Sequence, residues 1–275
     1  MKRSIGVMQG RLSSSSDGKI QSFPWKTWEK EFELATDLGL NSIEWTIDLQ
    51  NFEEHPLVNE NMTNRILALR EEFPIKSNTI TCDFFMQFDP WHNSQSLSNL
   101  LAKFKLLAHS KVVMPGFVIV IPLVDLGSPK KSSDWESLRF FLRDLTQTLL
   151  QNSLLVAFEF DIKPVDQMLF LESLASDCFG VNFDSGNSAS YGFEPKSELQ
   201  TIARKLFNVH IKDRLLGAHT VPLGTGATNF YEVSRTLDEI GYSGSLILQG
   251  ARQPQISEIE TIRQYIVFCQ EMGLV

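Results

Sequence analysis

The stretch LVAFEFDIKPVDQMLFLESLASDCFGVNFD, residues 155–184, holds two short apolar runs separated by a segment of helical periodicity. The runs Leu155–Phe160 and Gly180–Phe183 have the length and composition of buried strands. Between them, apolar residues recur every three positions from Met168 to Leu174, which indicates one amphipathic helix. A strand, a helix and a second strand in this order predict a βαβ unit with two parallel strands.

The same alternation extends toward both ends of the chain. Six further apolar runs are predicted strands, and each is followed by a helical segment. These runs are Ile5–Met8, Ser42–Ile47, Ser77–Asp83, Phe117–Leu123, Asn208–Ile211 and Ser245–Leu248. Eight strand–helix pairs in 275 residues, with no linker between them, predict one domain over 1–275. This number of units favours a closed (β/α)8 barrel over an open doubly wound sheet.

The composition excludes several classes of protein. The formal net charge of −8 disfavours nucleic acid as a general partner, because a phosphate backbone repels an acidic chain. No stretch approaches 18 uninterrupted apolar residues, so no membrane span is predicted. Cys82, Cys178 and Cys269 lie far apart without metal-type spacing, which predicts three buried, reduced thiols in a cytoplasmic protein.

Four polar residues, Glu159, Asp184, His210 and Gln249, fall at the ends of four successive predicted strands. Catalytic residues of a barrel lie at the carboxyl ends of its strands, so all four are expected at one rim. Buried carboxylates are costly unless they are paired or bound to a cation. Two carboxylates and an imidazole suit a divalent metal ion. A hydrogen-bonded polar layer that closes the barrel explains the same spacing, and both interpretations stay open at this point.

Five stretches carry a more specific pattern: Ala35–Trp45, Asn182–Asn187, Val209–Arg214, Val221–Gly226 and Gly241–Gly244. In this order they resemble the xylose-isomerase-like TIM barrels, which include sugar isomerases, sugar and sugar-phosphate 3-epimerases and inosose dehydratases. The resemblance runs over nearly the whole chain. It is specific for the superfamily and does not identify a substrate.

The resemblance implies a divalent cation (Mn, Mg, Co or Zn) held by four strand-end ligands. Glu159, Asp184 and His210 match three of them, and Gln249 stands where the family has a glutamate. A carboxamide is neutral and cannot act as a base, so Gln249 predicts weaker cation binding and removes one of the two bases that the family's epimerases use. Asn187 is a second departure, because several relatives carry a histidine there.

The function that the resemblance implies is a sugar or sugar-phosphate isomerase or epimerase. Glu159 is the expected base beside the carbonyl, with a metal or Lys212 stabilising the enediolate oxygen. A polyol or inosose dehydratase and a catalytically impaired sugar-binding barrel are the alternatives. Pairing into a homodimer is also implied, and the polar loop Ser13–Ser16 is a candidate lid. The side chains expected to contact sugar hydroxyls or a terminal phosphate are Gln9, Arg11, Glu44, Asp83, Asn187, Arg214 and Arg252.

Overall fold

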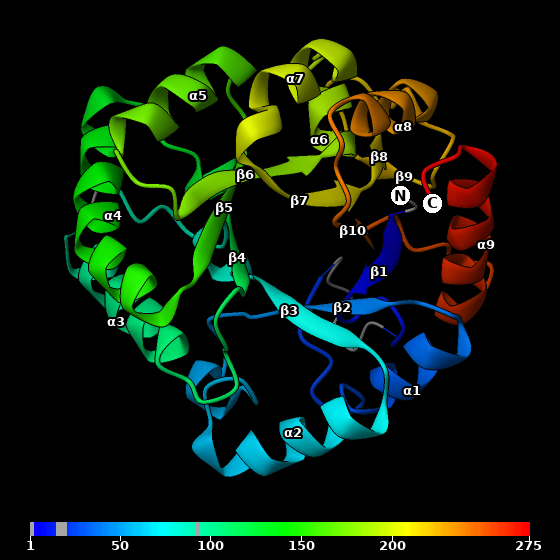
Figure 1. The fold of residues 1–275 in the computed structure, drawn as a ribbon, viewed down its shortest axis with the longest axis horizontal. Coiled ribbons are helices and arrows are strands. Elements are labelled where there is room, and N and C mark those ends of the chain that lie inside the picture. Colours follow the sequence, from blue (N-terminus) through cyan, green and yellow to red (C-terminus); the bar gives the residue numbers. More distant parts are fainter. Residues whose placement is uncertain (1–2, 15–20, 92–93) are drawn as a thin grey trace.

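The computed structural model describes residues 3–14, 21–91 and 94–275. Eight parallel strands close into a barrel in the order β1-β10-β7-β6-β5-β4-β3-β2, and a ring of helices surrounds it (Figure 1). The predicted (β/α)8 barrel is therefore confirmed. The barrel strands are β1 (Ser4–Met8), β2 (Ser42–Thr46), β3 (Lys76–Thr81), β4 (Val118–Leu123), β5 (Leu155–Phe160), β6 (Phe179–Asp184), β7 (Leu206–Ile211) and β10 (Ser245–Leu248).

The outer helices each bury one apolar stripe against the strands. Side-chain caps define some of their starts: Asn229 accepts the Glu232 N–H before α8, and Ser257 accepts the Glu260 N–H before α9. The helices are α1 (Lys30–Asp37), α2 (Thr63–Glu72), α3 (Ser94–Ala108), α4 (Ser132–Asn152), α5 (Pro164–Ser173), α7 (Pro195–Ile202), α8 (Phe230–Glu239) and α9 (Glu258–Glu271). Short 3-10 turns cover 52–54, 60–62, 83–85, 125–127 and 203–205.

A short helix and a pair of antiparallel strands at the carboxyl end of the barrel were not predicted. The short helix α6 (Ser185–Ser190) follows β6 directly, and its sequence SGNSAS has no apolar repeat that would announce a helix. The two-residue strands β8 (Asp213–Arg214) and β9 (Thr220–Val221) pair antiparallel beside β7 (Figure 1). Both elements add polar side chains above the strand ends.

The inward face of β4 and β5 is apolar below Glu159. Val118, Val120 and Ala157 form a small buried cluster separate from the large core between strands and helices. Side chains alternate along a strand, so Glu159 lies on the same face as Ala157, one step nearer the carboxyl end. The apolar layer thus supports the polar residues that follow it.

The three cysteines are free and buried, as predicted. None of the described helices is both long and apolar enough to cross a membrane. The candidate lid Ser13–Ser16 lies partly outside the described residues, since these resume only at residue 21.

Candidate active site

The structure brings Glu159, Asp184 and His210 together at the carboxyl ends of β5, β6 and β7. Each side chain offers one ligand atom, and these three atoms lie within 4.8 Å of one another. All three residues are buried. The pairing of Asp184 with His210 across β6 and β7 sets two of them side by side. This donor set, two carboxylates and one imidazole, fits a divalent cation.

His210 is held from behind by Glu44. Its Nε2 lies 2.7 Å from Glu44 Oε1, and Thr81 Oγ1 donates to the same oxygen at 2.6 Å. Asn208 Nδ2 donates to the other Glu44 oxygen at 2.8 Å. A carboxylate behind an imidazole fixes the ring and leaves the opposite nitrogen for a metal. That nitrogen, Nδ1, faces Glu159 Oε2 at 3.4 Å.

The charges around His210 change its proton affinity. Burial alone would lower the pKa of His210, but the carboxylates of Glu44 and Glu159 raise it to about 10. Burial alone would raise the pKa of Glu44, but the charge and hydrogen bond of His210 lower it below its ordinary value. A cation that binds His210 Nδ1 must therefore displace a proton, and its affinity should rise with pH.

Two amides fix the carboxylate of Glu159. Asn182 Nδ2 donates to Glu159 Oε2 at 2.9 Å and lies 3.1 Å from His210 Nδ1. Asn187 Nδ2 donates to Glu159 Oε1, and the Asn187 backbone N–H donates to Asp184 Oδ1 at 2.8 Å. Arg214 Nη1 in turn donates to Asn187 Oδ1 at 2.7 Å. Asn187 thus links Glu159 and Asp184 to Arg214 on the cavity wall.

A cavity of about 300 Å³ opens above these residues. Seven of the side chains expected at the site line it: Arg11, Asp83, Glu159, Asn187, Lys212, Arg214 and Gln249. The sequence did not single out the other lining residues, among them Gln21, Tyr191 and His219. These three lie in the loops after β1, α6 and β8, where no periodic pattern announces a position.

Three expected contact residues lie elsewhere. Glu44 is fully buried and hydrogen-bonded to His210. Its position therefore fits a residue that orients the imidazole better than one that contacts a sugar hydroxyl. Gln9 is buried, and its side-chain oxygen and nitrogen have no partner among the described residues. Arg252 donates to the Gly10 and Ser13 carbonyl oxygens and to Glu258, and it lies outside the lining of the cavity.

Lys212 and Gln249 complete the inner wall. Lys212 Nζ lies 3.4 Å from Asp184 Oδ2. Gln249 Nε2 donates to Met8 Sδ at 3.2 Å, whereas its Oε1 is buried with no partner among the described residues. The carboxamide oxygen is therefore free to bind a cation or a hydroxyl.

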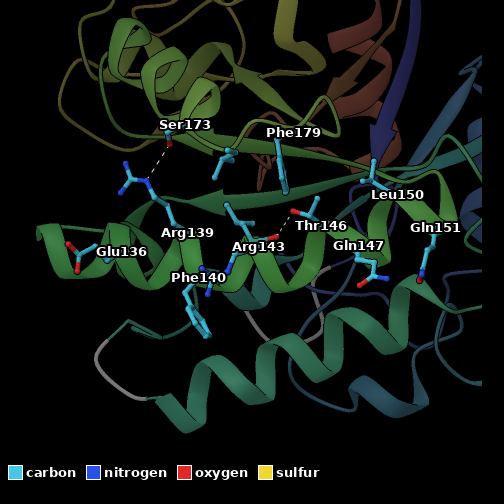
Figure 2. Close-up of a pocket in the computed structure, with 12 residues that line it drawn as sticks. Glu136, Arg139, Phe140, Arg143, Thr146, Gln147, Leu150, Gln151, Ser173 and Phe179 are labelled. Carbon is cyan, nitrogen blue, oxygen red and sulfur yellow. Dashed lines mark hydrogen bonds between the residues drawn. The ribbon is translucent and has the colours of Figure 1, made fainter.

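A second hollow, of about 770 Å³, lies on the outside of the barrel against α4 (Figure 2). Figure 2 shows Arg139 of α4 reaching Ser173 of α5, with Nε donating to Oγ at 3.3 Å. Phe179, the first residue of β6, also lines this hollow. None of the described residues that line this hollow lies at the carboxyl end of a barrel strand, so the smaller cavity is the candidate site.

Comparison with known proteins agrees with this geometry. Residues 32–271 match the model of the xylose isomerase-like TIM barrel family. The chain belongs to this family. It is 29% identical over 115 residues to a putative L-ribulose-5-phosphate 3-epimerase, SgbU, of Escherichia coli (strain K12). That alignment covers 38% of the present chain and 40% of the length of SgbU.

Solved structures show the same fold. D-psicose 3-epimerase, crystallised in the presence of D-fructose, superposes with a TM-score of 0.77 at 12% identity over 99% of this chain and 100% of its own. The IOLI protein, crystallised with a zinc atom, superposes with a TM-score of 0.70 at 17% identity over 98% of both chains. At these identities the likeness concerns the fold alone.

In this xylose isomerase-like barrel, replacing Glu44 with glutamine should weaken the binding of a cation to the deprotonated form of His210 by about tenfold. The neutral amide no longer raises the pKa of His210, so proton competition falls and cation affinity should vary less steeply between pH 6 and 9. Calorimetric titration with Mn²⁺ at several pH values measures both effects. The exposed Glu33→Gln variant is the control, and an unchanged pH slope would contradict the supporting role of Glu44.

Glu198 of α7 should make the stability of the barrel depend on pH. Ser188 Oγ donates to its carboxylate, and burial, reinforced by the charge of Asp184, raises the pKa of Glu198 from 4.5 to about 7. The folded state binds this proton more tightly than the unfolded state, so stability is lost as pH rises from about 4.5 to about 7.

Glutamine at position 198 does not ionise. We expect Glu198→Gln to unfold with a free energy about 1–3 kcal/mol higher than wild type at pH 8 and equal to it near pH 5. Urea denaturation of the metal-free protein measures the difference. The exposed Glu172→Gln variant should show no such trend, and a gain at pH 5 equal to that at pH 8 would refute the assignment.

Proposed function

We propose that the chain is a sugar isomerase-type enzyme that moves a proton on the carbon next to a carbonyl group. The observation that carries the proposal is the Glu159 carboxylate, which lines a polar cavity while amides hold both of its oxygens. A general base must be positioned before the reaction, because its efficiency depends on geometry first and on pKa second. The relatives named for sugar epimerisation support the same class of substrate.

A divalent cation fits the donor set of this site. Glu159, Asp184 and His210 would hold it, and Gln249 Oε1 is a neutral fourth donor on the same cavity. Such a cation, when bound, supplies positive charge that polarises a carbonyl oxygen. The zinc atom in the IOLI structure supports this cofactor class.

The remaining steps belong to side chains of the protein. Glu159 takes the proton from the carbon beside the carbonyl. Lys212, on the cavity wall beside Asp184, donates a hydrogen bond to the oxygen on which negative charge develops. Arg11, Asp83 and Arg214 contact the other hydroxyl groups, and Asn187 keeps Glu159 in place.

The carboxamide at position 249 favours chemistry with a single base. Epimerisation by two opposed glutamates needs a second proton carrier, and a carboxamide does not exchange protons near neutral pH. Isomerisation needs only Glu159, which takes the proton from the carbon beside the carbonyl and returns it to the former carbonyl carbon of the enediolate. Dehydration likewise needs only Glu159 to remove the first proton. A dehydratase-type lyase is therefore the second candidate, and Gln249 is the observation that favours it.

Solvent exchange tests the proposal. The Mn²⁺-loaded protein is incubated in D₂O with D-fructose, D-tagatose and D-ribulose, and products are followed by NMR and mass spectrometry. We expect deuterium on the carbon beside the carbonyl, together with an isomeric sugar. Loss of water from the sugar would instead identify the lyase. Tight sugar binding without any exchange would show a barrel that binds sugars but has lost catalysis.

A further inference from the structure

We propose that the substrate is an uncharged, monosaccharide-sized polyhydroxy ketone rather than a phosphate ester. The inference rests on the proposed function and names the substrate class of the same cavity. Three observations carry it. A carboxylate of the protein already fills the turn where barrels commonly bind phosphate, and the arginines of the cavity already donate hydrogen bonds to the protein. The carboxyl group of Asp83 lines the cavity and has no partner among the described residues.

The turn after β9 is already occupied by a carboxylate of the protein. Barrels commonly bind phosphate in the loops after the seventh and eighth strands, through backbone N–H groups. Here Asp213 is fully buried. Its Oδ2 accepts hydrogen bonds from the backbone N–H groups of Gly224 at 2.9 Å and Gly226 at 2.8 Å. Its Oδ1 accepts the N–H of Thr228 at 3.1 Å. The donors that would bind a phosphate are used, and the Asp213 charge would repel one.

Glycine at position 226 is part of this arrangement. A Cβ there would lie closer than a normal contact to Asp213 Oδ1 and to the Arg214 carbonyl oxygen. The backbone thus approaches the carboxylate as closely as it would approach an anionic ligand. We infer that the turn is built around Asp213 and not around a substrate group.

The cationic side chains of the cavity are also engaged. Arg214 donates to Asn187 Oδ1 at 2.7 Å and to the Ala218 carbonyl oxygen at 2.9 Å. Arg11 donates to the Gly250 carbonyl oxygen at 3.1 Å and to Gln21 Oε1 at 2.8 Å. Strong phosphate sites present several charge-assisted donors together. Each of these arginines already gives two hydrogen bonds to the protein, which fix its guanidinium in place.

The charge of the lining points the same way. Besides Arg11 and Arg214, Lys212 is a third cation on the wall, and its ammonium lies beside Asp184. Three carboxyl groups also line the cavity, those of Asp83, Asp125 and Glu159. The described lining therefore carries as many carboxyl groups as Lys and Arg side chains, and not a cluster of cations alone that would attract a dianion.

Asp83 offers the groups that a neutral polyol needs. It is 2% exposed, it lines the cavity, and neither of its carboxyl oxygens has a partner in the described part of the chain. Burial, and then the charges of Asp48 and Glu159, raise the pKa of Asp83 well above its ordinary value. A buried polar group without a partner destabilises the protein, and a sugar hydroxyl, which donates and accepts, removes this cost.

The size of the cavity sets the size of the ligand. A volume of about 300 Å³ is at the lower end of the range for small-molecule pockets, about 300–1,000 Å³. A monosaccharide suits this space better than a glycoside with two sugar rings.

Matched pairs of sugars test the inference. D-fructose and D-fructose 6-phosphate, and D-ribulose and D-ribulose 5-phosphate, are titrated into the Mn²⁺-loaded protein by calorimetry, and deuterium exchange is measured on each. We expect at least one free ketose to bind about tenfold more tightly than its ester, because like charges at a binding site cost affinity. Millimolar inorganic phosphate should not compete with it.

The outcomes separate this inference from the proposed function. An ester that binds as tightly as its free ketose, competition by phosphate, or binding of neither free ketose would overturn the inference. Exchange on the ester alone would also overturn it and leave the isomerase-type reaction standing. Preferred binding of a free ketose without exchange would support the inference and contradict the proposed reaction.

Two variants locate the recognition. Asp83→Ala should weaken binding of the preferred free ketose by about tenfold, whereas Asp83→Asn, which keeps hydrogen-bonding atoms, should stay within about threefold of wild type. The exposed Asp144→Ala variant of α4 is the control. Unchanged binding in Asp83→Ala would show that Asp83 does not contact the sugar, and it would contradict the assignment of Asp83 as the group that recognises the ketose.

Discussion

Replacing Glu159 with glutamine should lower the rate of deuterium exchange into the sugar by about a thousandfold, within the range of about 10²–10⁴ that general bases contribute. The amide is nearly isosteric with the carboxylate and keeps an acceptor for Asn182 or Asn187. It cannot take a proton from carbon. The measurement is kcat/KM for exchange in D₂O at saturating Mn²⁺.

Glu159 is also a candidate ligand, so the two roles must be separated. Calorimetry gives the Mn²⁺ affinity of the variant, and exchange is then measured at a concentration that fills the site. A lost ligand is compensated by more cation, whereas a lost base is not. Glu136→Gln, an exposed change on α4, is the matched control. Exchange within tenfold of wild type at full occupancy would refute Glu159 as the base.

The barrel was predictable because each strand carries its own signal. Runs such as Leu155–Phe160 and Ser245–Leu248 are apolar except for one residue each, Glu159 and Ser245, as expected for parallel strands covered on both faces, and their observed bounds match the predicted ones. The period of two along β5 also placed Glu159 on the inner face. The meeting of Glu159, Asp184 and His210 follows from these strand ends.

The depth of Glu44 was not predictable from its position on β2. Closing a barrel staggers neighbouring strands, so the height of a residue depends on register across the whole sheet. Glu44 pairs with Met8 on one side and with Thr79 on the other, which sets it below the rim and behind His210. Its sequence neighbours contain no information about that register.

Other residues near the site lie in loops and short elements, and the sequence did not predict their positions. Tyr191 follows α6, whose sequence has no apolar repeat, and Asp213 begins a strand of two residues. Asp213 acquires its position from hydrogen bonds with the backbone N–H groups of the turn at 224–228, which follows it in the chain. Patterns of apolar residues do not encode such bonds.

Changing Gln249 to glutamate should tighten Mn²⁺ binding on the order of a hundredfold, or about 2.8 kcal/mol at about 1.4 kcal/mol per tenfold. The new carboxylate adds a charged ligand where the wild type has a free carboxamide oxygen. Without a cation the same carboxylate is buried beside Met8 and unpaired, so the metal-free variant should be less stable than wild type. Calorimetry and thermal unfolding with and without Mn²⁺ measure both effects.

The Gln249→Glu variant should also change the products. A second group that exchanges protons on the same cavity permits removal by one carboxylate and return by the other, so an epimer of the sugar should join the isomer. Gln249→Met, similar in size and without a ligand oxygen, separates the effects: it should weaken Mn²⁺ binding if Gln249 Oε1 is a ligand in the wild type. Equal Mn²⁺ affinity in the wild type and both variants would place position 249 outside the cation site, and the single-base interpretation would then lose its structural basis.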